Sequence, residues 1–201
     1  MRYKHFKNAD IDVSELAVGT WGLDSNRWST GSSREEAIDA IRMMVAQGVN
    51  LIDTAANYGN GAAEQIVGEA IKTIDRSKIL ISTKFGVPND FYKRNVRGVY
   101  RDAKFGSVLR ELASSLRNLQ TDYVDFYFLH WPDPSTPIAE TMCALNFAAD
   151  IQDQPGCSGN DLQNGTADLI FTSKHLYLHL LSGKEPTKRG ASRACKGRYR
   201  R

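Results

Sequence analysis

The sequence predicts an α/β fold in which parallel strands alternate with helices, and three observations lead to this prediction. Short apolar runs bounded by turn residues recur along residues 1–147. Segments of about 10–15 residues with helical spacing of apolar side chains separate these runs. Polar or ionisable residues end successive runs, as at the functional edge of a parallel sheet. This alternation allows either a doubly wound sheet or a (β/α)8 barrel.

The chain begins with a predicted hairpin. The runs RYKHF and IDVSELAVG, residues 2–6 and 11–19, flank the turn-like KNAD. A polar, glycine-containing loop follows. Ser33 then has the character of a helix N-cap, and Glu36 completes a capping box with it. The helix that begins there is expected to stop near Gly48.

Two strand–helix units follow this first helix. The run VNLID, residues 49–53, is short and apolar, as expected of a strand buried on both faces. A helix is predicted over about residues 62–73. The β-rich run ILISTKF, residues 79–85, precedes a helix whose leucines have 3-4-3 spacing: Leu109, Leu112, Leu116 and Leu119.

The last predicted unit pairs the strand YVDFYFLH, residues 123–130, with a helix that has Pro137 in its first turn and reaches about Phe147. Polar groups thus stand at four successive strand ends. Taken singly, Asp53 could be a helix N-cap and His130 a core histidine. Four such groups at equivalent places indicate one shared site, namely Gly19–Thr20–Trp21, Asp53, Lys84 and His130.

Tyr58 lies in the glycine-containing loop DTAANYGNG and completes a set that suits carbonyl reduction. The reaction needs a hydride from a cofactor and a proton for the developing alkoxide. A tyrosine can donate that proton, although the pKa of tyrosine is about 10. The ammonium of Lys84 would favour the phenolate, and Asp53 would hold that ammonium. His130 would orient the carbonyl oxygen or share in proton transfer.

Four stretches resemble the aldo-keto reductase family and occur in the family's order. They are LAVGTWGL, GVNLIDTAANYGNGAAEQIVGEAI, ISTKFG and DYVDFYFLHWPDP. The resemblance covers about residues 1–147 and implies a (β/α)8 TIM-type barrel. It implies NADPH-dependent reduction of an aldehyde or ketone to an alcohol, with a small carbonyl compound as substrate.

Residue by residue, the resemblance implies Tyr58 as the proton donor, Lys84 as the group that tunes it, and Asp53 as the partner of Lys84. His130 would orient the substrate. The cofactor would be contacted by Gly19, Thr20, Trp21 and Asp53, and the substrate by Trp21 and Trp131. The loops expected to line the pocket include residues 23–30 and 87–104.

The resemblance stops near residue 150, where the family would continue with a Gly-Lys-Ile/Val-Arg turn and this chain reads IQDQPGCSGNDLQ. We therefore expect an incomplete, truncated barrel over residues 1–150: about four strand–helix units plus the N-terminal hairpin. Residues 151–201 are expected to form an irregular, poorly ordered, non-family tail. The half of the family fold that clamps the cofactor is then missing. The alternative function is a catalytically inactive fragment or a binding protein that uses its basic tail.

Charge and composition limit the kinds of partner that the sequence predicts. Residues 184–201 carry eight Lys or Arg against one acidic residue, which is typical of a solvated tail, so no nucleic acid is expected as a partner. The N-terminus has no apolar signal core, and no run approaches the ~20 apolar residues of a membrane helix. A cytoplasmic protein without a membrane partner is expected, and the sequence leaves its oligomeric state open.

Other cofactor sites are not indicated. The three cysteines are widely spaced without a Cys-x-x-Cys pair, so no metal site is expected. A Rossmann dehydrogenase would need Gly-x-Gly-x-x-Gly after the first strand, and GTWGLDSNRWSTG does not fit that spacing.

Overall fold

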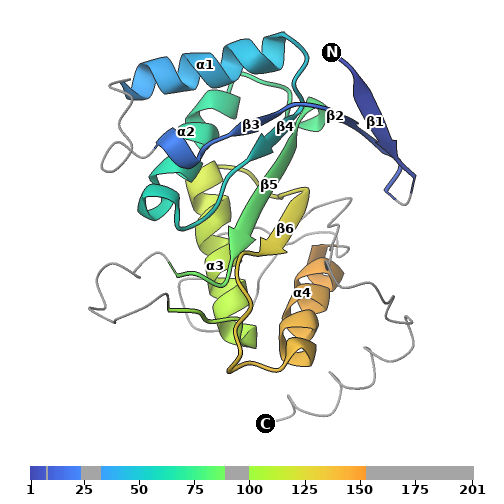
Figure 1. The fold of residues 1–201 in the computed structure, drawn as a ribbon, viewed down its shortest axis with the longest axis vertical. Coiled ribbons are helices and arrows are strands. Elements are labelled where there is room, and N and C mark those ends of the chain that lie inside the picture. Colours follow the sequence, from blue (N-terminus) through green and yellow to red (C-terminus); the bar gives the residue numbers. More distant parts are fainter. Residues whose placement is uncertain (8, 24–32, 89–99, 153–201) are drawn as a thin grey trace.

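The computed structural model describes residues 1–7, 9–23, 33–88 and 100–152. Its centre is a four-stranded parallel sheet in the order β3-β4-β5-β6 (Figure 1). Because the strand order follows the chain without reversal, the sheet has the winding of a barrel rather than of a doubly wound fold. The strands are β3 (Ala17–Gly19), β4 (Leu51–Asp53), β5 (Leu80–Phe85) and β6 (Phe126–Leu129).

A helix follows each strand of this sheet, and consecutive helices pack against each other. The predicted four strand–helix units with an N-terminal hairpin are therefore confirmed. Three short 3-10 turns, η1 (Trp21–Leu23), η2 (Tyr58–Gly61) and η3 (Arg76–Lys78), lie in the connections. The helices are α1 (Arg34–Ala46), α2 (Ala62–Ile71), α3 (Phe105–Leu119) and α4 (Ile138–Gln152).

The hairpin differs from the prediction at its second strand. The run expected as one strand over residues 11–19 forms β2 (Ile11–Ser14), paired antiparallel with β1 (Tyr3–Phe6), and then the separate strand β3. Ser14 explains the break, because its hydroxyl donates to the carbonyl of Leu16 at 2.6 Å and its N–H donates to the Asn50 side chain at 2.8 Å. These bonds end the hairpin pairing and turn the chain into the parallel sheet.

The first helix begins as its sequence predicts. The Ser33 hydroxyl accepts the N–H of Glu36 at 3.1 Å, and the Glu36 carboxylate accepts the N–H of Ser33 at 2.7 Å. This reciprocal pair is a capping box and satisfies two N–H groups that the helix leaves unbonded. After α1, Gly48 takes a φ of 94°, a left-handed conformation that suits glycine at a helix end.

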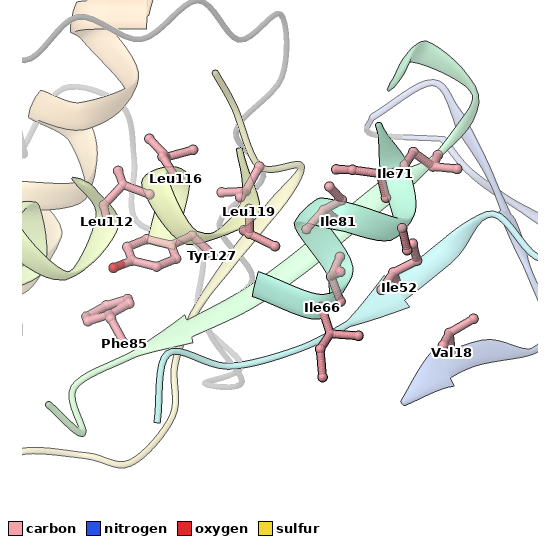
Figure 2. Packing of buried hydrophobic residues seen from close by; sticks show 14 of the residues in the cluster. Val18, Ile52, Ile66, Ile71, Ile81, Phe85, Leu112, Leu116, Leu119 and Tyr127 are labelled. Carbon is pink, nitrogen blue, oxygen red and sulfur yellow. The ribbon is translucent and has the colours of Figure 1, made fainter. Parts of the chain in front are cut away.

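The hydrophobic core lies between the sheet and its helices. Figure 2 shows Ile52 and Ile81 of the sheet facing Ile66 of α2, and Tyr127 of β6 beside Leu112 of α3. All five are buried. Because side chains alternate along a strand, the residues between these point to the opposite, concave face. That face carries half-buried apolar side chains: Leu51, Leu80, Phe126 and Phe128.

Helices α2 and α3 approach closely at Gly68. A Cβ added there would lie 2.5 Å from the carbonyl oxygen of Asn118 and 2.8 Å from the backbone of Leu119. One turn earlier, the buried carboxylate of Glu64 accepts the Thr83 hydroxyl at 2.7 Å and the Asn118 amide at 2.9 Å. The hydrogen bonds of Glu64 therefore join α2 to both α3 and β5.

The last helix runs to Gln152, beyond the expected end near Phe147. The tail predicted for residues 151–201 lies, from residue 153 onward, outside the described residues. No helix in the described ranges has the length and apolar character needed to cross a membrane.

Candidate active site

The carboxyl ends of the parallel strands lie side by side because backbone hydrogen bonds continue past them. The N–H of Thr20 donates to the carbonyl of Asp53 at 3.1 Å. The N–H of His130 donates to the carbonyl of Phe85 at 2.8 Å. The residues that directly follow β3 and β6 are therefore fixed against neighbouring strands.

Lys84 and Asp53 form the centre of this edge. The Nζ of Lys84 donates to both carboxylate oxygens of Asp53 and to the carbonyl of Thr54, each at 2.8 Å. A lysine ammonium has three N–H groups, so all of them are used. Strand register explains the meeting, because Asp53 is paired with Ser82 and Lys84 lies two residues further on the same face.

Ser82 is a part of this arrangement that the sequence reasoning missed. Its hydroxyl donates to Oδ1 of Asp53 at 2.9 Å, so it fixes the carboxylate from a second side. The signal was present, because Ser82 precedes Lys84 by two residues and strand periodicity puts both on one face.

The loop after β4 brings Tyr58 to Lys84. The N–H of Ala56 donates to the carbonyl of Lys84 at 3.4 Å, so the loop runs beside the end of β5. The N–H of Tyr58 donates to the carbonyl of Ala55 at 3.1 Å, which turns the chain back. As a result, the Lys84 ammonium lies 5.3 Å from the centroid of the half-buried Tyr58 ring.

The turn that follows Tyr58 depends on glycine. Gly59, Asn60 and Gly61 take φ values of 56°, 58° and 90°. The left-handed region costs most L-residues roughly 1–2 kcal/mol, but glycine enters it freely and asparagine tolerates it. The sequence GNG therefore permits a tight left-handed turn directly before α2.

His130 closes the arrangement on the β6 side. Its ring meets the Tyr58 ring edge to face, with centroids 5.8 Å apart and planes at 77°. Burial lowers the pKa of His130, and the charge of Lys84 lowers it further against the opposing effect of Asp53. The imidazole is therefore neutral at neutral pH and has one N–H to donate.

The remaining predicted residues lie around this centre, three of them at its surface and one of them buried. Trp21 and Trp131 are 59% and 47% exposed, and the rings of His130 and Trp131 have centroids 6.4 Å apart. Gly19 ends β3 with nothing within 4 Å of a Cβ built on it, so the space beside it is open. The side chain of Thr20 is buried, and its hydroxyl donates to the carbonyl of Asp53 at 3.0 Å.

The structure thus brings all eight predicted site residues to one edge of one sheet. The ammonium of Lys84 and the ring of His130 bring together the four predicted catalytic residues. The other four lie at the strand ends around them: Gly19, Thr20, Trp21 and Trp131. The catalytic and binding roles of these residues stay predictions. The central group offers a fixed cation beside a phenol and a neutral imidazole, which suits proton transfer to an oxygen atom.

Residues 15–153 match the model of the Aldo/keto reductase family. The chain belongs to the aldo/keto reductase family. The match begins one residue before the stretch LAVGTWGL, which starts at Leu16, and ends one residue after α4, so it covers the whole parallel sheet.

Two curated aldo/keto reductase relatives are similar in sequence. The aldo-keto reductase YhdN of Bacillus subtilis is 39% identical over 142 residues, which are 70% of this chain and 41% of the relative. The NADH-specific methylglyoxal reductase of Escherichia coli is 38% identical over 146 residues, which are 68% of this chain and 45% of the relative. The chain therefore spans less than half the length of these two relatives.

Solved aldo/keto reductase structures share the fold. The holo form of AKR11C1 from Bacillus halodurans superposes with a TM-score of 0.63 at 31% identity, over 75% of this chain and 47% of that one. An aldo-keto reductase from Klebsiella pneumoniae in complex with NADPH superposes with a TM-score of 0.58 at 28% identity, over 75% and 46% of the two chains. The predicted partial barrel is thus confirmed as the N-terminal part of this family's fold.

Proposed function

We propose that this chain carries the proton-transfer site of an NADPH-dependent aldo/keto reductase that reduces an aldehyde or ketone to an alcohol. The observation that supports it is the Lys84 ammonium, held at 2.8 Å by both oxygens of Asp53 and 5.3 Å from the centroid of the Tyr58 ring. A cation fixed beside a phenol favours the phenolate that remains after the proton has left.

In this proposal the Tyr58 hydroxyl donates its proton to the carbonyl oxygen of the substrate. Lys84 stabilises the negative charge left on the tyrosine oxygen, and Asp53 keeps Lys84 charged and in place. The neutral imidazole of His130 donates its N–H to the same carbonyl oxygen and so orients the substrate. The exposed rings of Trp21 and Trp131 bound the substrate on two sides.

The cofactor's nicotinamide would supply the hydride. The strand ends fit its flat ring and ribose, because the space beside Gly19 is open and residue Trp21 is 59% exposed. The Asp53 side chain is 39% exposed and free to accept a ribose hydroxyl. Thr20 would act through its backbone and through the hydrogen bond from its hydroxyl to the carbonyl of Asp53. NADPH is proposed over NADH because a solved family member holds NADPH, although one relative is named as NADH-specific.

The proposal assigns the activity to residues 1–150, with residues 151–201 as a tail outside the catalytic fold. It places the protein in the cytoplasm.

Two measurements on the 201-residue protein test the proposed activity. Titration with NADPH and with NADH should quench tryptophan fluorescence, with NADPH binding more tightly. Addition of a neutral aldehyde such as butanal should then oxidise the bound nucleotide, followed at its absorbance band.

The decisive variant is Tyr58→Phe, which removes only the hydroxyl. General acid catalysis contributes about 10²–10⁴-fold, so we expect kcat to fall at least about 100-fold with nearly unchanged cofactor affinity. Tyr123→Phe is the matched control, because its hydroxyl contacts the carbonyl of Arg76 before β5, away from the site. Equal loss in both variants would contradict the proposed role of Tyr58. Absence of both quenching and turnover in the unmodified protein would favour the inactive binding protein.

A further inference from the structure

Arg101 lies at the mouth of the proposed site, in the loop between β5 and α3. The carbon of its guanidinium lies 5.2 Å from the centroid of the Trp131 ring. Its Nη1 donates to the carbonyl of Pro132 at 3.1 Å. Trp131 directly follows His130, and their ring centroids are 6.4 Å apart. The cation is therefore held one aromatic ring away from the group proposed to orient the carbonyl.

The charge of Arg101 is not neutralised within the described part of the chain, where no carboxylate lies within ion-pair distance of it. The two nearest acids in sequence have other partners. Asp102 accepts the N–H of Lys104 at 3.2 Å, and Asp133 accepts the N–H of Ala103 at 3.0 Å and the Thr136 hydroxyl at 2.6 Å.

An arginine has five N–H donors in a planar fork, and this one uses Nη1 on a backbone carbonyl. The remaining donors suit the two oxygens of a carboxylate, which arginine binds in a bidentate manner. The Trp131 ring limits the freedom of the guanidinium, so less entropy is lost when a ligand binds.

We propose that Arg101 binds a carboxylate of the substrate, so that the site prefers short carbonyl compounds that carry a carboxylate at the end remote from the carbonyl. This inference rests on the proposed function. The carbonyl would lie between Tyr58 and His130, and the chain of the substrate would cross the exposed face of Trp131. A spacer of a few carbon atoms fits one aromatic ring between the two groups. Sequence reasoning missed Arg101, which lies in a predicted pocket loop without any pattern that marks it.

The test measures binding, which needs neither cofactor nor turnover. The probes are 4-hydroxybutanoate, the alcohol product of 4-oxobutanoate, and neutral butan-1-ol, each titrated while tryptophan fluorescence is followed. Hydrogen bonds to charged groups are stronger than neutral ones, so we expect the carboxylate probe to bind roughly tenfold or more tighter than butan-1-ol. Arg101→Gln should abolish this preference, and Arg101→Lys should retain part of it.

Arg117→Gln is the matched control, because Arg117 is exposed in the last turn of α3, at the far end from the site. It should leave the preference unchanged. Equal affinity for the two probes, no binding of either, or a preference that survives Arg101→Gln would each overturn the inference. Failure of the proposed function is seen separately, as absence of NADPH oxidation with both butanal and 4-oxobutanoate.

Discussion

Lys84 is a nearly buried cation whose three donors all end on oxygen atoms. Its side chain is 17% exposed, and two of its bonds go to one carboxylate. Removing one partner of such a pair leaves the other charge poorly solvated, which costs more than the pair contributes when intact. The stability of this part of the sheet is therefore coupled to the same two side chains as its proposed chemistry.

We expect Asp53→Asn to lower the free energy of unfolding by roughly 1–3 kcal/mol, because Lys84 loses its charged partner. Lys84→Met made in the Asp53→Asn background should cost less than Lys84→Met alone. Urea denaturation of the four proteins gives the coupling energy, which should be at least about 0.5 kcal/mol. Additive effects would mean that the two side chains do not depend on each other.

Glu111, on α3, is a buried acid outside the proposed site. Its Oε2 accepts the N–H of Gly86 at 3.1 Å, and its Oε1 has no hydrogen-bond partner among the described residues. Burial raises the pKa of Glu111 from its ordinary 4.5 to about 8, with Asp102 and Glu64 acting in the same direction and Arg110 against it. Between these two pH values the unfolded carboxyl is ionised while the folded one keeps its proton. Folding stability attributable to Glu111 is thus complete below pH 4.5, is lost as pH rises towards 8, and changes no further above it.

Glu111→Gln should remove this dependence. The variant should gain stability relative to the unmodified protein between about pH 5 and pH 8, by at least about 1 kcal/mol, since one pKa unit corresponds to about 1.4 kcal/mol. Urea unfolding at several pH values measures the difference. Glu35→Gln makes the same change at an exposed position of α1 and is the matched control for the substitution itself. A stability difference between Glu111→Gln and the unmodified protein that does not change with pH would refute a shifted titration of Glu111.

At the scale of elements, the helix pair α2–α3 is held by a backbone approach that leaves no room for a methyl group at Gly68. Gly68→Ala should lower stability by roughly 1–3 kcal/mol, because backbone atoms must move apart. Gly106→Ala is the control, since Gly106 is also helical and its Cβ would meet the flexible Arg110 side chain at 3.1 Å. That change should be neutral or stabilising by up to ~1 kcal/mol. Thermal unfolding of the Gly68→Ala and Gly106→Ala variants measures the difference. Similar melting temperatures would mean that α2 and α3 can move apart at little cost in free energy.

The elements were predictable where local chemistry decides them. Ser33 and Glu36 mark the start of α1, and the leucine spacing marks α3. The break between β2 and β3 was not predictable, because it depends on Asn50, which is 36 residues away in the chain. In the site, the order of strands made the meeting of Asp53 and Lys84 predictable. The approach of Arg101 to Trp131 was not, because it depends on the path of a loop.

At the scale of the whole molecule, the described sheet ends at β3 on one side and β6 on the other. Its concave face carries four half-buried apolar side chains that point away from the helices: Leu51, Leu80, Phe126 and Phe128. Unpaired strand edges and exposed apolar surface favour association with other chains. We therefore expect the 201-residue protein to associate as its concentration rises.

Phe128→Lys should reduce this association, because it places a charge on the concave face without entering the core on the helix side. Light scattering across a concentration series measures the effect. Phe6→Lys makes the same change on the exposed strand β1 and should have little effect. A monodisperse monomer at all concentrations, with a cooperative melt, would show that the concave face is covered.

The proposed proton-transfer set has a further consequence for how such a site can be inherited. Asp53 ends β4 and Lys84 lies in β5, whereas Tyr58 opens η2 after β4 and His130 directly follows β6. Their relative positions depend on the hydrogen-bond register of three adjacent strands. Recombination that exchanged this one stretch of coding sequence would transfer the whole set intact. Such an exchange would keep the proposed proton-transfer set while the rest of the barrel changes.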